Sequence, residues 1–186
     1  MVDNSFYCVP FTLGAAEEPT FTVQNTPPPG GDGRTIGYWK NWSSCTGGGQ
    51  EPVLDETLAM SLIIPDGKPG VYIGKLFVDM CSEAVAILNK STLAGKKMSS
   101  DAAYELAAQL LAAKLNVLAG ARDCTTLQTL IRDAQALLVS INFTGTGDYL
   151  GPKVKGTLLT KRNQALAYAK LLDNYNNNKE GAACMP

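Results

Sequence analysis

The chain has 186 residues, with 16 lysines and arginines against 17 aspartates and glutamates, and it contains no histidine. This removes the commonest general base and the commonest metal ligand. A Ser-His-Asp triad, a Cys-His pair and a His-ligated metal are therefore excluded for this chain alone. A formal net charge of -1 gives no electrostatic reason to expect nucleic acid or an anionic membrane as a partner.

The length suits one substantial domain with a short appendage. No apolar run approaches the roughly 20 residues that span a bilayer, so we expect no membrane insertion. The N-terminus lacks a basic stretch followed by an apolar one and therefore predicts no signal peptide. If the protein is exported, we expect this chain to be a mature piece whose leader has been removed.

Residues 1–26 predict a short β segment. Residues 11–13 and 20–23 have the pattern of two short strands, and in the second strand Phe21 and Val23 alternate with polar residues. About 25 residues cannot bury a core alone. The segment is therefore either the end of an upstream Ig-like domain or a pair of strands that pack on the helical domain or on another subunit.

Residues 27–33 are expected to form a hinge or spacer. Three consecutive prolines favour an extended polyproline conformation, and the glycines that follow release it. From residue 34 to residue 186 the pattern becomes helical. The predicted organisation is thus a β segment, a Pro/Gly hinge and a helical module.

Helical periodicity predicts a mainly α fold, a compact bundle with short helices and a small β appendage or hairpin at the N-terminus. Short helices are expected over residues 54–62 and 81–89. The β-branched and aromatic stretch 71–78 between them predicts either a small strand or an extended connector.

Three longer helices follow. The clearest covers residues 101–119, where apolar side chains keep the three-and-four spacing and Gly120 stands beyond the end. The next begins at Thr125 with capping-box spacing, and the two should form an antiparallel hairpin. The final helix is expected over residues 157–175, and its alanine-rich seam favours close packing.

The cysteines bear on the compartment, and five are present: Cys8, Cys45, Cys81, Cys124 and Cys184. They are widely spaced and form no Cys-x-x-Cys, so neither a zinc knuckle nor a thioredoxin-like site is indicated. Disulfides explain cysteines in loops and tails, and we expect the pairs Cys81–Cys124 and Cys45–Cys184. Cys8 then remains odd. The alternative is a cytosolic protein with reduced thiols.

Four sequence blocks support a resemblance, and they occur in this order: TIGYWKN at residues 35–41, EAVAILN at 83–89, AAQLLAAKLN at 107–116 followed by AGA, and LDNYNN at 172–177. The chain from Arg34 to Cys184 resembles a secreted bacterial module that opens on a T-x-G-[YF]-W-K-N-like motif. Members continue with an Ala-rich QLxAAKLN helix and close on LDxYNN and a terminal cysteine.

The resemblance implies a secreted or cell-surface bacterial protein, because the module usually follows Ig-like or other surface domains in large exported proteins. The family has no established catalytic residues. The chain departs from it at Trp42, where a histidine is common in relatives, and in the long insertion between Gly47 and Gly70. Both departures weaken any site carried over from relatives that use the histidine.

The opening motif is the candidate binding site, with Tyr38, Trp39, Lys40, Asn41 and Trp42. On a helical turn Tyr38 and Trp42 share a face while Trp39 points away. The simpler interpretation is that these aromatics close one end of the bundle, with their indole N–H groups bonded to backbone carbonyls. The functional interpretation is a stacking platform for sugar rings or a Pro-rich peptide, with Lys40 and Asn41 supplying polar contacts.

Catalysis without histidine would need carboxylates, and the candidates are Glu83, Glu105, Asp133 and Asp148. A glycoside hydrolase needs only two carboxyl groups, about 5 Å or about 6.5–9.5 Å apart. Sequence spacing does not show such a pair, and charged residues scattered on amphipathic helices usually belong to the solvated face.

Asp173 and Asn174 are candidate calcium ligands in the closing motif. One carboxylate among amides lacks the spacing of a dedicated calcium loop. The alternative is an Asn-rich helix end and turn, because asparagine readily adopts the left-handed conformation. We expect no cofactor.

These observations predict an extracellular or cell-surface module for adhesion, assembly or display. It would bind through the aromatic residues or by adding its N-terminal strand to a neighbouring sheet. The expected partners are other surface domains or identical subunits, with glycans as a further option. Binding is favoured over catalysis. The alternatives are a polysaccharide-acting hydrolase that uses a carboxylate pair and a carbohydrate-binding module.

Overall fold

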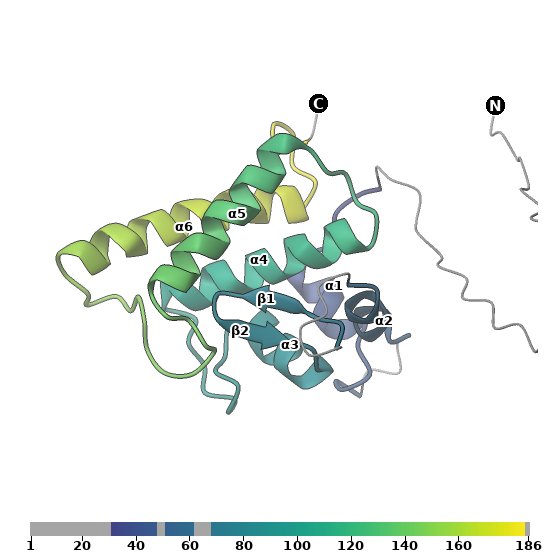
Figure 1. Ribbon diagram of the computed structural model, residues 1–186, viewed down its shortest axis with the longest axis horizontal. Helices are drawn as coiled ribbons and strands as arrows, with labels where there is room; N and C mark the ends of the chain where they lie inside the picture. The colour runs from purple at the N-terminus through teal and green to yellow at the C-terminus, as the bar shows by residue number, and fades with distance from the viewer. Residues whose placement is uncertain (1–30, 48–50, 62–67, 185–186) are drawn as a thin grey trace, which may run out of the picture.

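The computed structural model describes residues 31–47, 51–61 and 68–184. Within these residues the elements are, in chain order, α1 (Ile36–Asn41), α2 (Val53–Ala59), β1 (Val71–Ile73), β2 (Leu76–Val78), α3 (Cys81–Leu88), α4 (Ala102–Leu118), α5 (Thr125–Ser140) and α6 (Thr157–Asn176) (Figure 1). The predicted mainly α bundle is confirmed. The two strands expected in residues 11–13 and 20–23, like Cys8, lie outside the described residues.

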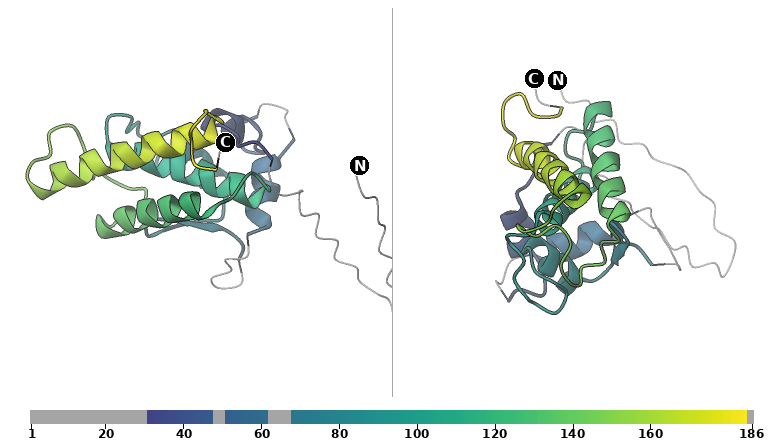
Figure 2. Two further views of the ribbon diagram at one scale, coloured as in Figure 1. Left: turned by 90° about the horizontal axis from the view of Figure 1, so that it is seen from above. Right: turned by 90° about the vertical axis from the view of Figure 1, so that its left-hand side faces the viewer.

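Helix α4 is the centre of the fold. Its residues are buried almost without interruption from Ala102 to Ala113, and the alanines among them let neighbouring helices approach closely. Helix α6 packs along α4, while α5, α3 and the hairpin contact its other sides (Figures 1 and 2). The predicted α4–α5 helical hairpin is present.

Asp101 caps the start of α4 from a buried position. Its carboxylate accepts hydrogen bonds from the backbone N–H groups of Ala103, Tyr149 and Leu150. Three N–H donors at a helix N-terminus compensate a buried negative charge. This carboxylate therefore orders the loop before α6 and is not free for chemistry.

The stretch 71–78 forms a two-stranded antiparallel hairpin. Val71 pairs with Val78 and Ile73 with Leu76, and these four side chains are buried against the helices. Gly74 turns the chain at φ +63°, where a Cβ atom would lie 2.9 Å from the carbonyl oxygen of Phe143. A glycine is therefore required at this turn.

Two disulfides are present, Cys45–Cys81 and Cys124–Cys184. The predicted pairing, Cys81–Cys124 and Cys45–Cys184, is wrong. The loop after α1 lies against the start of α3, where the Cys45 N–H also donates to the Cys81 sulfur. The start of α5 lies beside the tail that follows α6, so the four cysteines meet in the other combination.

None of the helices in the described part of the chain is both long and apolar enough to cross a bilayer.

Candidate functional site

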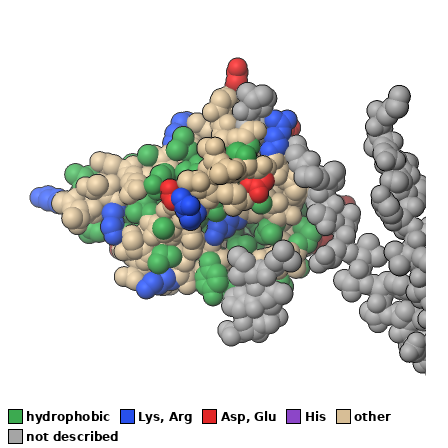
Figure 3. Space-filling view, turned by 45° about the horizontal axis from the view of Figure 1, so that its top comes forward, with side chains coloured by type: hydrophobic (Ala, Val, Ile, Leu, Met, Phe, Trp, Pro, Cys, Tyr) green, Lys and Arg blue, Asp and Glu red, His purple; other side chains and the backbone are tan. Residues whose placement is uncertain are grey.

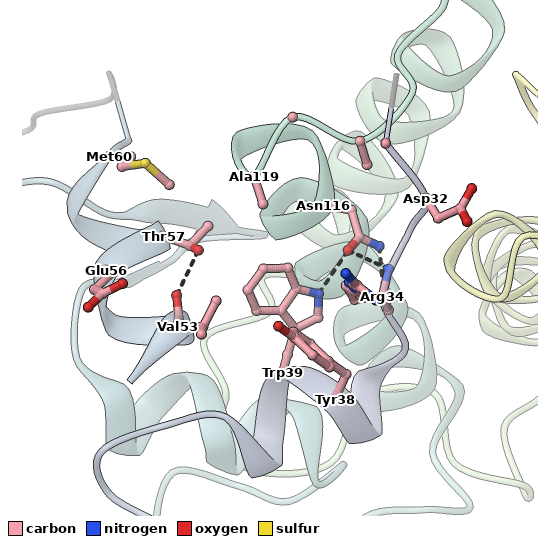
Figure 4. A pocket seen from close by; sticks show the side chains of 13 residues that line it. Asp32, Arg34, Tyr38, Trp39, Val53, Glu56, Thr57, Met60, Asn116 and Ala119 are labelled. Atoms are coloured by element: carbon pink, nitrogen blue, oxygen red, sulfur yellow. Dashed lines mark hydrogen bonds between the residues drawn. The ribbon is translucent and has the colours of Figure 1, made fainter. Parts of the chain in front are cut away.

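Asn116 of α4 makes hydrogen bonds to residues near both ends of the described chain. Its Oδ1 accepts hydrogen bonds from the indole Nε1–H of Trp39 at 2.9 Å and from the backbone N–H of Arg34 at 2.8 Å (Figure 4). Its Nδ2 donates to the Arg34 carbonyl and to Oδ1 of Asn176, both at 2.9 Å. The side chain is 1% exposed. All its polar capacity is therefore used inside the protein.

The hydrogen bonds continue from Asn176 into the closing motif. Asn176 donates to the carbonyl and the Oε1 of Gln109, and Gln109 donates to Asp173. The opening motif, the Ala-rich helix and the closing motif thus meet in one buried polar network. Their polar residues are explained by folding, and the network needs no ligand to satisfy it.

The chain enters this network in an extended conformation at residues 31–34. Gly31 donates its N–H to the Gly120 carbonyl and accepts from the N–H of Arg122. The side-chain amide of Asn178 bonds both the N–H and the C=O of Gly33. Residues 31–33, the last part of the predicted hinge, therefore pack on the helical body.

The side chains of Arg34, Tyr38 and Trp42 form a second group outside the network, and we call it the aromatic edge. The rings of Tyr38 and Trp42 stack with centroids 5.4 Å apart and an interplanar angle of 19°. The Arg34 guanidinium lies over the Tyr38 ring, 5.0 Å from its centroid, in cation–π geometry. Tyr38 and Trp42 thus share one face of α1, as the spacing predicts.

The two tryptophans differ in their surroundings. Trp39 is 0% exposed, belongs to the core, and bonds the Asn116 amide where a backbone carbonyl was expected. Trp42 is only half-buried and lies outside the packed core. Neither its indole N–H nor the Tyr38 hydroxyl has a hydrogen bond within the described residues. The structural interpretation therefore fits Trp39, and the binding interpretation fits Trp42.

A pocket of about 520 Å³ adjoins the aromatic edge (Figure 4). Tyr38 and Trp39 form one wall, α2 forms another, and the turn between α4 and α5 closes the back. Three charged residues line it, Asp32, Arg34 and Glu56, and none of their side chains has an ion pair or hydrogen bond within the described residues. The site thus offers an aromatic rim and charges of both signs, with Arg34 placed over the Tyr38 ring.

Lys40 and Asn41 are also on α1. Lys40 is half-buried and Asn41 exposed, and neither side chain has a hydrogen bond in the part of the chain that the structure describes. Helical spacing places Lys40 on the side of α1 away from Tyr38 and Trp42, and neither residue lines the pocket.

The four candidate catalytic carboxylates have separate surroundings. Glu105 pairs with Lys90, Asp133 with Arg132, and Asp148 with Lys96. Burial and the nearby charge of Asp79 raise the pKa of Glu83, and its Oε2 has no partner in the described residues. No hydrogen bond or ion pair of the described chain joins two of the four, and none of them lines the pocket.

The calcium candidates lie where α6 ends. Asp173 accepts from the side chains of Gln109, Asn177 and Lys179, and Asn174 accepts the Lys179 N–H through its carbonyl. Asn178 adopts the left-handed conformation at φ 54°. Among the described residues no group of three or more histidine, cysteine, aspartate or glutamate side chains could hold a metal. The helix-end interpretation accounts for all of these contacts.

Sequence reasoning missed Lys114, which the helical periodicity places with the apolar residues of α4. Its Nζ donates to the carbonyl of Tyr72 at 2.6 Å and to Oε1 of Gln135 at 3.3 Å. Burial lowers its pKa to about 8. Glu105, Gln109, Lys114 and Asn116 are the charged and amide residues of an otherwise apolar helix, and that contrast was the available signal.

No protein-family model, curated protein or solved structure matches this chain. The resemblance to a secreted bacterial module stays an expectation from the four sequence blocks.

Proposed function

We propose that this chain is an extracellular or cell-surface interaction module, serving adhesion, assembly or display, that binds its partner through the aromatic edge and the adjoining pocket. Trp42 carries the proposal. It is stacked on Tyr38 outside the core, and its N–H is unused within the described residues. Large aromatic side chains of this kind dominate binding energies at protein surfaces.

The aromatic edge is supported from behind. Trp39 anchors α1 to Asn116, and the Cys45–Cys81 disulfide ties the loop after Trp42 to α3. A platform held on both sides loses little conformational entropy when a ligand binds. Its ligand would place a flat apolar group, a proline or a sugar ring, on the outer face of Trp42.

The pocket favours a ligand that also carries charge. Arg34 suits a carboxylate, because its planar guanidinium offers paired donors. Asp32 and Glu56 suit an ammonium or guanidinium group. Charges of both signs beside an aromatic rim favour an extended peptide over a neutral glycan.

Two further observations support this choice. Disulfides form and persist in oxidising compartments, and two are present, which supports an extracellular location. Three of the four candidate carboxylates, Glu105, Asp133 and Asp148, pair with separate cations, and none of the four lines the pocket, which favours binding over hydrolysis. Addition of the N-terminal strand to a partner sheet stays a prediction, since residues 11–13 and 20–23 lie outside the described residues.

The test compares Trp42→Ala with Tyr72→Ala. Tyr72 is a matched control, because it is a partly exposed aromatic that contacts another ring, Phe77, on the hairpin. The probes are a synthetic Pro-rich peptide library with acidic and basic positions and a panel of chitin, cellulose and glucan oligosaccharides, titrated by calorimetry.

Loss of at least tenfold in affinity in Trp42→Ala, with Tyr72→Ala unchanged, is expected for the best-binding probe. Equal binding by both variants, or no binding of any probe to the native chain, would reject the aromatic edge as the ligand site.

A further inference from the structure

The N-terminal half of α6 exposes three leucines, which we call the leucine face. Leu158, Leu159 and Leu166 are 43%, 44% and 41% exposed. This half of the helix extends past the rest of the bundle (Figure 1). Exposed apolar side chains grouped on one flank of a helix mark an interaction site more often than scattered ones do.

The surroundings of the leucine face are basic. Residues 151–172 contain Lys153, Lys155, Lys161, Arg162 and Lys170, five cations, and no aspartate or glutamate. Figure 3 shows basic and hydrophobic side chains together at this end of the molecule.

Only two of these cations are occupied by contacts. Lys161 donates to Ser140, and Arg162 donates to the carbonyls of Ser100 and Leu150. Lys153, Lys155 and Lys170 have no side-chain partner within the described residues. Their charges remain available to a partner.

The chain itself contains a segment of complementary chemistry. Residues 1–30 carry Asp3, Glu17 and Glu18 and no lysine or arginine, so their side chains sum to three negative charges. Phe21 and Val23 alternate with polar residues directly after the acidic pair. Apolar side chains that follow two carboxylates in this segment complement the leucines and the nearby lysines of α6.

We propose that the leucine face binds the acidic N-terminal segment, residues 1–30, of a second copy of this chain. The contact would link chains head to tail, which is a heterologous association. It uses a surface other than the aromatic edge, so it stands or falls separately from the proposed function.

The position of Gly31 favours a second copy over the same chain. Gly31 is bonded at the turn between α4 and α5, to Gly120 and Arg122. Lys161 marks the side of α6 that contacts α5. Leu159 and Leu166 lie about 140–160° around the helix from Lys161, whereas Leu158 lies about 60° from it. The chain's own segment therefore starts on the side of α6 away from Leu159 and Leu166.

The experiment uses two charge-reversal variants of the full chain. One reverses the segment, Glu17→Lys with Glu18→Lys, and the other reverses the rim of the leucine face, Lys155→Glu with Lys170→Glu. Lys68→Glu with Lys75→Glu is the matched control, since both lysines are exposed near the hairpin. Sedimentation velocity over a hundredfold concentration range measures association, and circular dichroism checks folding.

The native chain and the control should associate as concentration rises, and each reversed variant alone should need at least tenfold higher concentration. A 1:1 mixture of the two reversed variants should associate like the native chain, because each supplies the charge that the other now requires. Added NaCl should weaken all of these associations through screening.

Three results would overturn the proposal. The first is a native chain that stays monomeric throughout. The second is a mixture no better associated than its components, which would indicate docking within one molecule. The third is a monomer that binds vesicles of phosphatidylcholine and phosphatidylserine through Lys155 and Lys170, which would assign the face to anionic lipid.

Discussion

The amide of Asn116 shows how much of this protein depends on single side chains. It supplies the partner of the buried Trp39 indole and of Asn176, and it holds the backbone of Arg34. A buried polar group left without a partner costs about 1–3 kcal/mol. The hydrogen bonds of Asn116 therefore contribute substantially to the stability of the folded protein.

Replacing Asn116 by alanine should lower the free energy of unfolding by about 3 kcal/mol, because the Trp39 N–H and the Asn176 amide lose their partners. Urea titration followed by circular dichroism measures this change. Asn163→Ala, on the exposed side of α6, is the control and should change stability by less than about 0.5 kcal/mol. Similar values for both variants would show that the network does not hold the motifs together.

Gly33 is a second position where stability depends on a single residue, because there is no space for a Cβ atom. A Cβ atom there would lie 3.0 Å from the carbonyl oxygen of Tyr175 and 3.3 Å from Nδ2 of Asn116, whereas a Cβ at Gly151 meets nothing within 4 Å. Gly33→Ala should destabilise the protein by about 1–2 kcal/mol through overpacking.

Gly151→Ala is the matched control and should be neutral or slightly stabilising. Thermal unfolding of the two variants side by side gives the comparison. A Gly33→Ala protein as stable as Gly151→Ala would mean that residues 31–34 are not held as tightly as their hydrogen bonds indicate.

At the scale of elements, side-chain amides hold segments outside the helices by bonding their backbone groups. Asn116 bonds both backbone groups of Arg34, Asn178 does the same for Gly33, and Gln135 does the same for Gly74. Each amide satisfies both backbone groups of one residue, in the opening segment at Gly33 and Arg34 and in the hairpin turn at Gly74. The opening segment and the hairpin are thereby fixed to helices.

Lys114 holds the hairpin to α4 and α5, and it should make stability depend on pH. Burial lowers its pKa from 10.5 to about 8 in the folded protein, so the unfolded chain binds more protons between these values. Stability should therefore rise with pH through this window, by about 2 kcal/mol between pH 7.5 and 9.5, and little gain should occur below it.

Urea titrations of the native protein and of Lys114→Met across pH 7–9.5 test this effect. The upper limit keeps the measurement below the range where tyrosines of the unfolded chain ionise, since burial raises the pKa of Tyr175 to about 12 and opposes the trend there. Equal pH slopes for the two proteins would show that Lys114 is not the responsible group.

At the scale of the whole molecule, the two disulfides hold different parts of the protein in place. Cys124–Cys184 fastens the C-terminal tail to the start of α5, across 60 residues of sequence, and Cys45–Cys81 fastens the loop beside the aromatic edge to α3, across 36 residues. Loops of these lengths differ little in closure entropy. The bridges should therefore differ in function more than in stability.

Replacing either pair by alanine should destabilise the protein by about 2–4 kcal/mol. Only Cys45→Ala with Cys81→Ala should also weaken the probe binding that depends on Trp42. Urea titration and calorimetry measure the two effects, and a non-reducing peptide map checks the native pairing. A Cys81–Cys124 link in that map, or equal binding by both variants, would contradict this division.

Much of the architecture was predictable because it depends on local periodicity. The spacing of apolar residues in 101–119 identified α4, and the stretch 71–78 indicated a small strand or an extended connector, where the structure has a two-stranded hairpin. The helical position of Tyr38 and Trp42 put them on one face. Long-range contacts were less accessible, since sequence spacing says nothing about which loops meet in space, and the disulfide pairing was wrong for this reason.

The sequence by itself determined the helical class, excluded histidine chemistry, and singled out the opening motif, the Ala-rich helix and the closing motif. Only the tertiary structure decided what those motifs do. Trp39 and Trp42 are three residues apart, and from the sequence both could bind a sugar or a peptide. Trp39, however, is hydrogen-bonded to Asn116 in the core, whereas Trp42 is stacked on Tyr38 outside the core. Burial and hydrogen-bond partners come from segments far apart in the chain, and these contacts distinguish a structural residue from a binding residue.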